Sequence, residues 1–380
     1  MKVTEALFGK LVCPRTRQPL LREANIDTAA RWMEAKGFSP ITRRGMQGPR
    51  FETFDEVLLT ADGMIAFPVV DQFPALMWPD SIIHNGVQAE VDLSDRTYAE
   101  AYSEMAYYNP VGAQRADTLF SSSLYRDFQA LAKRADETGP GFPDPLDLWI
   151  ESAHDSGAQI DVYRYLAPLI DKTFLQLGGD GRHAVKALLA GAGQAVLITP
   201  MIGEAEFAYA LAESVGVDDR LSCVLGLGEE MPFMDGTFDA IYSPGCLHHM
   251  RLDIVLPEIR RVLQIGGRFA AHEPWRAPVY GIGTWLFGKR EHGLFNRTQS
   301  VFCSPITHQR LASLSDVFPV HIVQNHGPVL RYPMIVLDKL GLRLPTRRMI
   351  KIAEADDHIG TVLGLPATWG GSLMVGGEKT

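Results

Sequence analysis

Short apolar runs alternate with helix-forming segments along the second half of the chain, and this alternation constrains the fold more than any other feature. The runs at 173–179, 195–200, 221–228 and 238–243 have the length of buried strands. Between them, segments such as 204–216 place apolar residues three and four positions apart, as helices do. Strands joined by helical crossovers lie parallel, so the pattern predicts an α/β fold with a doubly wound sheet.

The rest of the sequence divides into further units, because 380 residues exceed one ordinary compact domain. Residues 1–80 are predicted to form a small β-rich domain, with two strands joined at Asp62 and Gly63, which tolerate positive φ. Residues 81–165 show helical spacing and form a connector that either caps a site in the next domain or packs between the two domains. The alternating segment lies within residues 166–380.

The charge balance argues against a nucleic acid as a partner. The net charge is −9, whereas nucleic-acid binding depends on clustered lysines and arginines that replace counterions. We interpret the densest basic group as the solvated face of a helix, although it is also the best candidate for a local basic patch. This group consists of Arg343, Arg347, Arg348 and Lys351.

The apolar runs and the cysteines predict a cytoplasmic protein with no membrane partner. No run approaches the roughly 20 apolar residues that span a bilayer. Glu5 and Lys10 interrupt the N-terminal apolar residues, which excludes a signal peptide. The cysteines form no C-x-x-C pair, so neither a zinc knuckle nor a disulfide framework is expected. They are Cys13, Cys223, Cys246 and Cys303.

Four segments of the second half follow one another in an order that resembles a known family. They are the glycine loop at 175–181, the acidic-Met-Pro-Phe segment at 228–239, the pair His248-His249, and E-I-R-R-V-L-Q-I-G-G at 258–267. Together they resemble class I S-adenosylmethionine (SAM) dependent methyltransferases of type 11, the group that includes enzymes of ubiquinone biosynthesis. The resemblance implies a Rossmann-like sheet of seven strands, completed by an antiparallel pair from the C-terminal segments 321–327 and 371–379.

The N-terminal domain resembles a second family. L-V-C-P at 11–14 and D-G-M-I-A-F-P-V-V-D-Q-F-P-A-L-M at 62–77 are similar to the small activator of tRNA and protein methyltransferases. Some members of that family hold zinc with four cysteines. Because only Cys13 is present here, we expect no metal in this domain.

The methyltransferase resemblance assigns SAM as cofactor to the carboxyl edge of the sheet. Glycines there let the backbone turn sharply and let a ligand approach, which we prefer to the alternative that they only make a tight strand-to-helix turn. The sequence departs from the family at Gln176, Thr199 and Leu227, where acidic residues are usual, and Glu204 or Glu229 could replace them. The expected cofactor residues are Gln176, Gly178, Gly179, Gly181, Thr199, Gly228, Glu229 and Ser243.

The candidate catalytic and substrate residues follow the fourth and fifth strands. His248 and His249 are candidate bases because an imidazole titrates near neutral pH, but one could instead cap a helix while the other packs. No histidine pair shows the i, i+4 spacing of a zinc helix, so no metal is expected. The expected substrate residues are His272, Glu273 and Trp275, together with Arg290 and Arg297.

Arg290 and Arg297 belong to an insertion at about 277–305 that we expect to be a lid over the substrate. Their guanidinium groups would clamp a carboxylate or phosphate. A surface excursion or a dimer contact explains the same segment, so a homodimer stays open.

Three functions fit the sequence, of which we expect the first. The first is a methyltransferase acting on a small-molecule substrate with SAM as cofactor. The second is a degenerate methyltransferase fold that serves as a binding or scaffold protein, which the missing acidic residues favour. The third is methylation of tRNA or protein, which the N-terminal resemblance favours and the acidic charge opposes.

Overall fold

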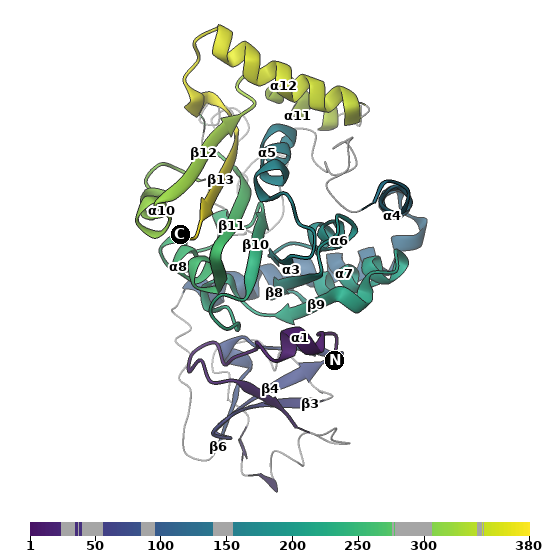
Figure 1. The fold of residues 1–380 in the computed structure, drawn as a ribbon, viewed down its shortest axis with the longest axis vertical. Coiled ribbons are helices and arrows are strands. Elements are labelled where there is room, and N and C mark those ends of the chain that lie inside the picture. The colour runs from purple at the N-terminus through teal and green to yellow at the C-terminus, as the bar shows by residue number, and fades with distance from the viewer. Residues whose placement is uncertain are drawn as a thin grey trace.

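The computed structural model describes residues 1–23, 35–36, 38–39, 56–84, 96–139, 155–275, 277, 306–339, 344 and 346–380. Two sheets organise these residues, a small one near the N-terminus and a larger one that carries most of the chain (Figure 1). Within the described residues, no helix has both the length and the apolar character required to cross a bilayer.

The small sheet has six strands in the order β1-β3-β4-β6-β2, with β5 paired to β4. The predicted hairpin is confirmed: β3 and β4 pair antiparallel, and Gly63 between them has φ +69°. Asp62 closes the turn by accepting a hydrogen bond of 3.0 Å from the Met64 amide. The resemblance of this domain to the activator family stays a prediction. The strands are β1 (Leu20–Arg22), β2 (Phe38–Ser39), β3 (Glu56–Thr60), β4 (Ile65–Val70), β5 (Phe73–Pro74) and β6 (Ile82–His84).

The large sheet confirms the predicted α/β fold. Its order is β12-β13-β11-β10-β7-β8-β9. The strands from β7 to β11 run parallel, and β13 pairs antiparallel with both β11 and β12, as expected of the C-terminal segments. The strands are β7 (Thr173–Leu177), β8 (Gln194–Thr199), β9 (Leu221–Leu225), β10 (Phe238–Pro244), β11 (Leu263–Pro274), β12 (Val320–His326) and β13 (Ser372–Glu378).

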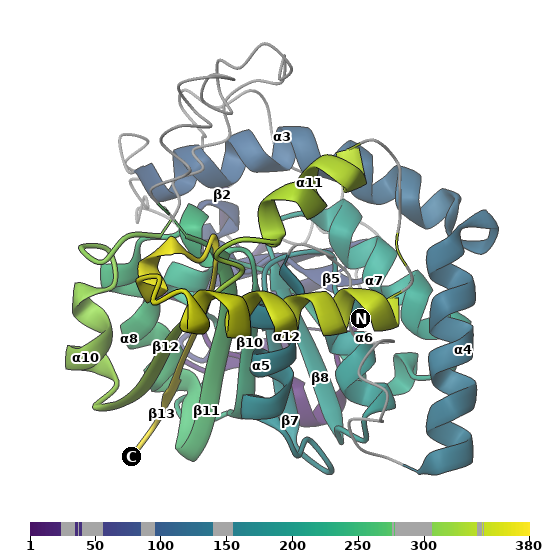
Figure 2. The same cartoon turned by 90° about the horizontal axis from the view of Figure 1, so that it is seen from above.

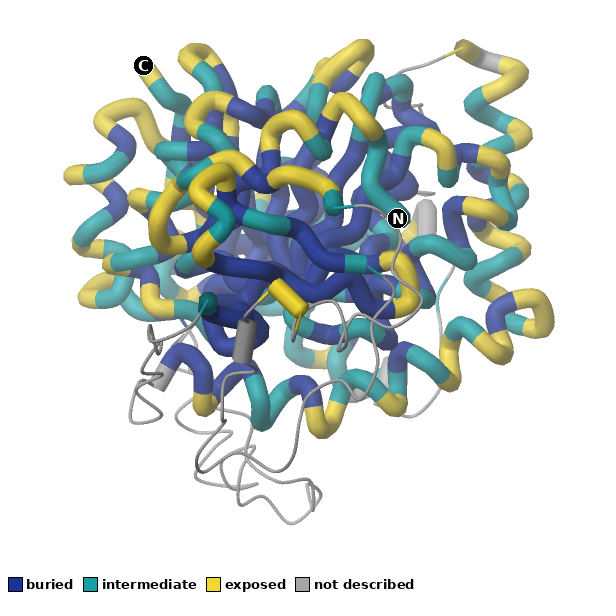
Figure 3. The backbone as a smooth tube through the Cα atoms, turned by 90° about the horizontal axis from the view of Figure 1, so that it is seen from below, coloured by how far each residue is buried: buried dark blue, intermediate teal, exposed yellow. Residues whose placement is uncertain are grey.

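Alternate side chains of each strand point to opposite faces of the large sheet, and both faces are covered. Phe174 belongs to a buried cluster that includes residues of α5, α6 and α7, whereas Leu175 belongs to a second cluster that includes residues of α8, α10 and the small sheet. Figure 3 shows the strands as a buried layer inside more exposed helices. The α-helices are α1 (Glu5–Phe8), α3 (Arg96–Asp117), α4 (Ser123–Thr138), α5 (Ser156–Leu166), α6 (Arg182–Leu189), α7 (Ile202–Ser214), α8 (Leu252–Val262), α10 (Ala312–Val317), α11 (Arg331–Lys339) and α12 (Thr346–Val362). The 3-10 helices are η1 (Trp78–Asp80), η2 (Leu119–Ser121), η5 (Asp218–Arg220), η6 (Gly228–Glu230), η7 (Leu247–His249) and η8 (Ala367–Trp369).

The connector helix α3 docks on α7 through two glycines (Figure 2). A Cβ atom on Gly112 would lie 2.4 Å from the carbonyl carbon of Gly203, and one on Gly203 would lie 2.3 Å from the Asn109 oxygen. Only glycine allows backbones to approach this closely. Arg115 adds an ion pair of 3.0 Å to Asp180, so α3 is held over the large sheet.

The small sheet attaches to the outermost strand of the large one. The Leu76 amide donates a hydrogen bond of 2.7 Å to the Leu225 oxygen, next to a parallel bridge between Ala75 and Leu225. Leu11 forms a second bridge, to Phe233. The contacts at Leu225 cover the end of β9, the edge strand of the large sheet.

Candidate functional site

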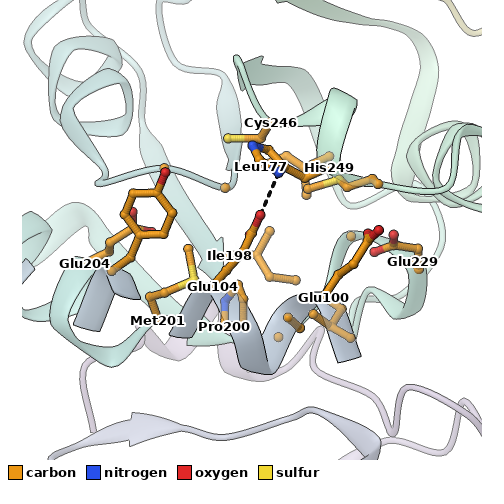
Figure 4. A pocket seen from close by; sticks show the side chains of 18 of the residues that line it. Glu100, Glu104, Leu177, Ile198, Pro200, Met201, Glu204, Glu229, Cys246 and His249 are labelled. Carbon is orange, nitrogen blue, oxygen red and sulfur yellow. Dashed lines mark ion pairs between the residues drawn. The ribbon is translucent and has the colours of Figure 1, made fainter. Parts of the chain in front are cut away.

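A cavity opens at the carboxyl ends of β7, β8, β9 and β10, with α3 as its outer wall (Figure 4). Its empty space is about 830 Å³ when the open mouth is included. β7 and β10 are neighbours from which the chain proceeds in opposite directions, and doubly wound sheets bind ligands at that switch point.

The glycine loop after β7 forms one wall of the cavity. Gly178 and Gly179 line it with φ values of +77° and +73°. A Cβ on Gly178 would lie 2.8 Å from the Cys246 sulfur. Gln176 is fully buried beneath the loop: its Nε2 donates to the Gly178 oxygen at 2.8 Å, and its Oε1 accepts from the Ala184 amide at 2.8 Å. Gln176 therefore supports the loop from below and does not line the cavity.

Gly181 serves helix packing in this structure. It has φ +80° and precedes α6, and a Cβ there would lie 2.2 Å from the Ala208 Cβ on α7. It is absent from the residues that line the cavity. Its neighbour Asp180 pairs with Arg115 and Arg182 and also leaves the cavity open.

A carboxyl group follows β8 at Glu204, five positions after the strand ends at Thr199. The buried Thr199 hydroxyl donates to Glu204 Oε2 at 2.8 Å, and of these two residues only Glu204 lines the cavity. Burial, reinforced by the charge of Asp180, raises the pKa of Glu204 to about 8, against the lowering effect of the Thr199 hydrogen bond. The site thus offers a carboxyl group from the first turn of α7.

A second buried carboxyl group follows β9. Gly228 and Glu229 both line the cavity, and a Cβ on Gly228 would lie 2.9 Å from the Met250 sulfur. Glu229 Oε1 accepts a hydrogen bond of 3.1 Å from the Arg251 amide. Burial raises the pKa of Glu229 to about 7, although that backbone hydrogen bond lowers it.

The two candidate bases occupy different environments. His249 lines the cavity, and its Nδ1 lies 2.6 Å from Oε1 of Glu104 on α3 (Figure 4). His248 does not line the cavity, and its Nδ1 lies 2.7 Å from Glu273 Oε2. Glu273 also accepts from the Leu247 amide at 2.7 Å. Glu273 therefore fixes η7 and His248, while His249 faces the cavity.

The remaining predicted site residues lie behind the cavity wall or outside the described residues. His272 Nδ1 lies 2.7 Å from the Tyr242 hydroxyl, and Trp275 Nε1 donates to the Thr368 oxygen at 3.1 Å. Ser243 is buried, and its hydroxyl has no hydrogen-bond partner among the described residues. None of these three lines the cavity. Arg290, Arg297 and the predicted lid, apart from Ala277, fall outside the described residues.

The structure adds residues that the sequence pattern did not single out. The α3 wall brings Thr97, Glu100, Glu104 and Tyr108 to the cavity. Their spacing of three to four positions was the available signal, but it marks a helix face without saying what that face contacts. Among the described residues, no group of three His, Cys, Asp or Glu side chains has the arrangement of a metal site.

An interaction between three segments braces this wall. The Arg15 guanidinium donates to the Tyr98 hydroxyl at 2.8 Å, and that hydroxyl donates to Glu230 Oε2 at 2.7 Å. Arg15 comes from the N-terminal domain, Tyr98 from α3, and Glu230 stands beside Glu229 in η6. The N-terminal domain therefore helps to fix the floor and wall of the cavity.

Comparisons with known proteins fall on the same segments. Residues 175–271 match the model of a family described as a methyltransferase domain. Sterol 24-C-methyltransferase ERG6B of Gibberella zeae is 35% identical over 105 residues, which are 27% of this chain and 27% of that protein. The ubiquinone/menaquinone biosynthesis C-methyltransferase UbiE of Rubrivivax gelatinosus is 29% identical over 143 residues, 34% of this chain and 55% of that protein.

Among solved structures, geranyl diphosphate C-methyltransferase from Streptomyces coelicolor A3(2) matches with a TM-score of 0.44 at 17% identity. That match covers 58% of this chain and 78% of the other. The chain spans about a quarter of the length of the first curated relatives that it matches. The family match runs from β7 to β11 and includes the glycine loop, both buried glutamates and the histidine pair. Residues 175–271 are therefore similar to a methyltransferase domain, and they lie on an α/β sheet of seven strands.

Proposed function

We propose that the protein is a SAM-dependent methyltransferase that acts on a small organic molecule. The observation that carries the proposal is the open cavity at the switch point of a methyltransferase-family sheet, bordered by two glycines of positive φ. Asp180 and Arg182, whose side chains could have filled the cavity next to this loop, form an ion pair with each other and do not line the cavity.

The residues present fit such a cofactor. Gly178, Gly179 and Gly228 line the cavity without a side chain, so the backbone itself borders the space that a ligand would fill. Glu204 and Glu229 offer buried carboxyl groups that can accept hydrogen bonds from hydroxyl or amino groups. They compensate for the neutral residues at Thr199 and Leu227, where the family has carboxylates. When bound, SAM supplies an electrophilic methyl group, and its sulfonium becomes a neutral thioether once that methyl group is transferred.

The chain itself positions the acceptor and accepts its proton. His249 is the proposed base, because it borders the cavity and its Nδ1 lies 2.6 Å from Glu104 Oε1. The thiol of Cys246 stays neutral, since burial and the charge of Glu273 raise its pKa.

The two other functions that fit the sequence receive less support. A scaffold without cofactor binding was favoured by the missing carboxylates, but Glu204 and Glu229 bring carboxyl groups to the same cavity. Methylation of tRNA would require a basic surface near the site, whereas the described cavity lining includes four glutamates and no lysine or arginine. Isothermal titration that gives no heat with either SAM or S-adenosylhomocysteine would remove the enzymatic proposal.

Replacing Gly178 by valine is expected to lower the affinity for SAM at least about 100-fold, equivalent to roughly 2.7 kcal/mol. The side chain would enter the space next to the Cys246 sulfur, at a φ of +77° that β-branched residues avoid. Titration calorimetry measures the loss. Gly216→Val is the matched control, because Gly216 has φ +70° with nothing within 4 Å of its Cβ position. Equal SAM affinity in Gly178→Val and wild type would contradict the assignment of the glycine loop.

A further inference from the structure

The segment 245–250, which follows β10, brings His249 to the cavity (Figure 4). It also supplies three other residues of the lining, Gly245, Cys246 and Met250. Its only regular structure is the short 3-10 helix η7, whose hydrogen bonds have poorer geometry than those of an α-helix. The direction in which His249 points therefore depends on the contacts that hold this segment from outside.

Strand β11 holds the start of the segment. The Gly245 amide donates a hydrogen bond of 2.9 Å to the His272 oxygen. Glu273 accepts hydrogen bonds from the amides of Leu247 at 2.7 Å and of His248 at 3.2 Å. These bonds fix the backbone up to His248, and they do not reach the part of the segment that carries the proposed base.

Arg310 holds that remaining part. Its Nη1 donates to the His248 oxygen at 3.2 Å, and its Nη2 donates to the Met250 oxygen at 2.9 Å. The two carbonyl groups stand on either side of His249, and the first belongs to the planar peptide unit that joins His248 to His249. Fixing the peptide units on both sides constrains the direction of the Cα–Cβ bond between them. A guanidinium group suits this task, because its donors form a rigid planar fork, whereas the ammonium group of lysine is a point charge on a flexible stem.

Arg310 is itself anchored at the edge of the large sheet. The chain leaves β11 at Trp275 and rejoins it at Ile306, where the two residues form a parallel bridge. The buried Ile306 donates its amide to the Pro274 oxygen at 3.0 Å. One residue further on, the Thr307 hydroxyl accepts a hydrogen bond of 3.3 Å from the Arg310 amide. The guanidinium group therefore ties the segment 245–250 to a second fixed point on the sheet.

We propose that Arg310 is a positioning residue of this site, which aims His249 at the cavity by holding the carbonyl groups on either side of it. The inference rests on the proposed function, in which His249 is the base, and deepens it. Arg310 does not line the cavity, so it acts through His249 and not on a ligand. A base must lie within hydrogen-bonding reach of the proton that it accepts, and a small misplacement of such a group lowers the rate of the reaction.

NMR of the full chain with isotope-labelled histidine tests the proposal and needs no methyl acceptor. The ring nitrogen signals of His249, identified by their absence in His249→Gln, report the orientation and contacts of that ring. His272, whose Nδ1 lies 2.7 Å from the Tyr242 hydroxyl, is the internal reference. Wild type is expected to give one sharp set of His249 signals. This set should move when S-adenosylhomocysteine is added, because His249 borders the cavity.

Arg310→Met removes both hydrogen bonds and is expected to broaden or split the His249 signals, with the His272 signals unchanged. The affinity for S-adenosylhomocysteine, measured by calorimetric titration, is expected to fall about three- to tenfold, since four residues of the held segment line the cavity. Arg310→Lys keeps the charge but not the fork, so its effects should be smaller and in the same direction. Arg220→Met is the matched control, because it also removes a guanidinium bond to a backbone oxygen, that of Ala192 at 3.0 Å, and it should leave His249 as in wild type.

The outcomes separate this inference from the proposed function. If S-adenosylhomocysteine neither binds to wild type nor moves its His249 signals, the proposed function fails. If it binds, and the His249 signals of Arg310→Met are as sharp and as responsive as those of wild type, this inference alone is overturned. A change in the His272 signals equal to that in the His249 signals would overturn it as well, because it would indicate a general loosening of the fold. If Arg310→Met does not fold, Arg310→Lys decides, and His249 signals identical to those of wild type would then contradict the proposal.

Discussion

Replacing Gly112 by leucine is expected to displace α3 from α7, destabilise the protein by about 1–3 kcal/mol and weaken SAM binding more than about tenfold. The Cβ of residue 112 would lie 2.4 Å from the backbone of Gly203, and backbone cannot swing aside as a side chain does. The displaced helix carries Glu100 and Glu104 away from the cavity. Leucine stabilises a helix relative to glycine by about 0.8 kcal/mol. Helix propensity alone would therefore raise the stability, so the expected loss of stability must come from the clash.

Gln114→Leu provides the matched control, since Gln114 is exposed on the same helix two positions further on. Urea unfolding gives the change in stability, and calorimetric titration gives the affinity for SAM. The control is expected to match wild type in both. A Gly112→Leu protein that binds SAM normally would show that α3 is not a required wall of the cavity.

The sequence was sufficient for the large sheet because its signals are local. Apolar runs of strand length, such as the one in β8 (Gln194–Thr199), alternate with helical segments. Strands joined by helical crossovers are parallel, so this local pattern is enough to predict the sheet. The same reasoning located the turn at Asp62 and Gly63. The antiparallel placement of β13 between β11 and β12 came from the family resemblance, since nothing local in Ser372–Glu378 specifies its neighbours.

The site was less predictable because its geometry depends on contacts between distant segments. Glu104 reaches His249 only because Gly112 and Gly203 let α3 settle on α7. Neither glycine belongs to a motif, and α3 could as well have packed between domains. The wall of the cavity therefore follows from a close backbone approach that a single sequence does not reveal.

Side-chain hydrogen bonds account for the other differences in the site. Gln176 was expected at the cofactor, but both ends of its amide are committed to Gly178 and Ala184. Thr199 lies beneath the surface of the cavity and bonds to Glu204, which is the residue that lines it. The family resemblance identifies the positions where a carboxylate is missing. Only the structure shows that Glu204 brings a carboxyl group to the same cavity.

Glu204→Gln is expected to stabilise the ligand-free protein increasingly as the pH rises. The pKa of Glu204 is raised to about 8 by burial, from an ordinary value of 4.5. Below the ordinary value the carboxyl is protonated in both folded and unfolded chains, and its burial as a neutral group is fully tolerated. As the pH rises, the unfolded chain ionises first, so wild type loses stability until the pH passes the folded pKa. Glutamine stays neutral throughout and can still accept the Thr199 hydrogen bond.

The gain at pH 8 over wild type is expected to be on the order of 3 kcal/mol, with little difference at pH 4 to 5. Urea unfolding at the two pH values measures it, and Glu213→Gln should show no pH-dependent gain. A difference that is the same at both pH values would indicate that Glu204 is not buried as a neutral acid. Because the same substitution is expected to weaken SAM binding, its effects on stability and on affinity have opposite signs. Opposite signs are expected if Glu204 serves ligand binding at the expense of stability. If its carboxyl group were purely structural, replacing it would destabilise the protein.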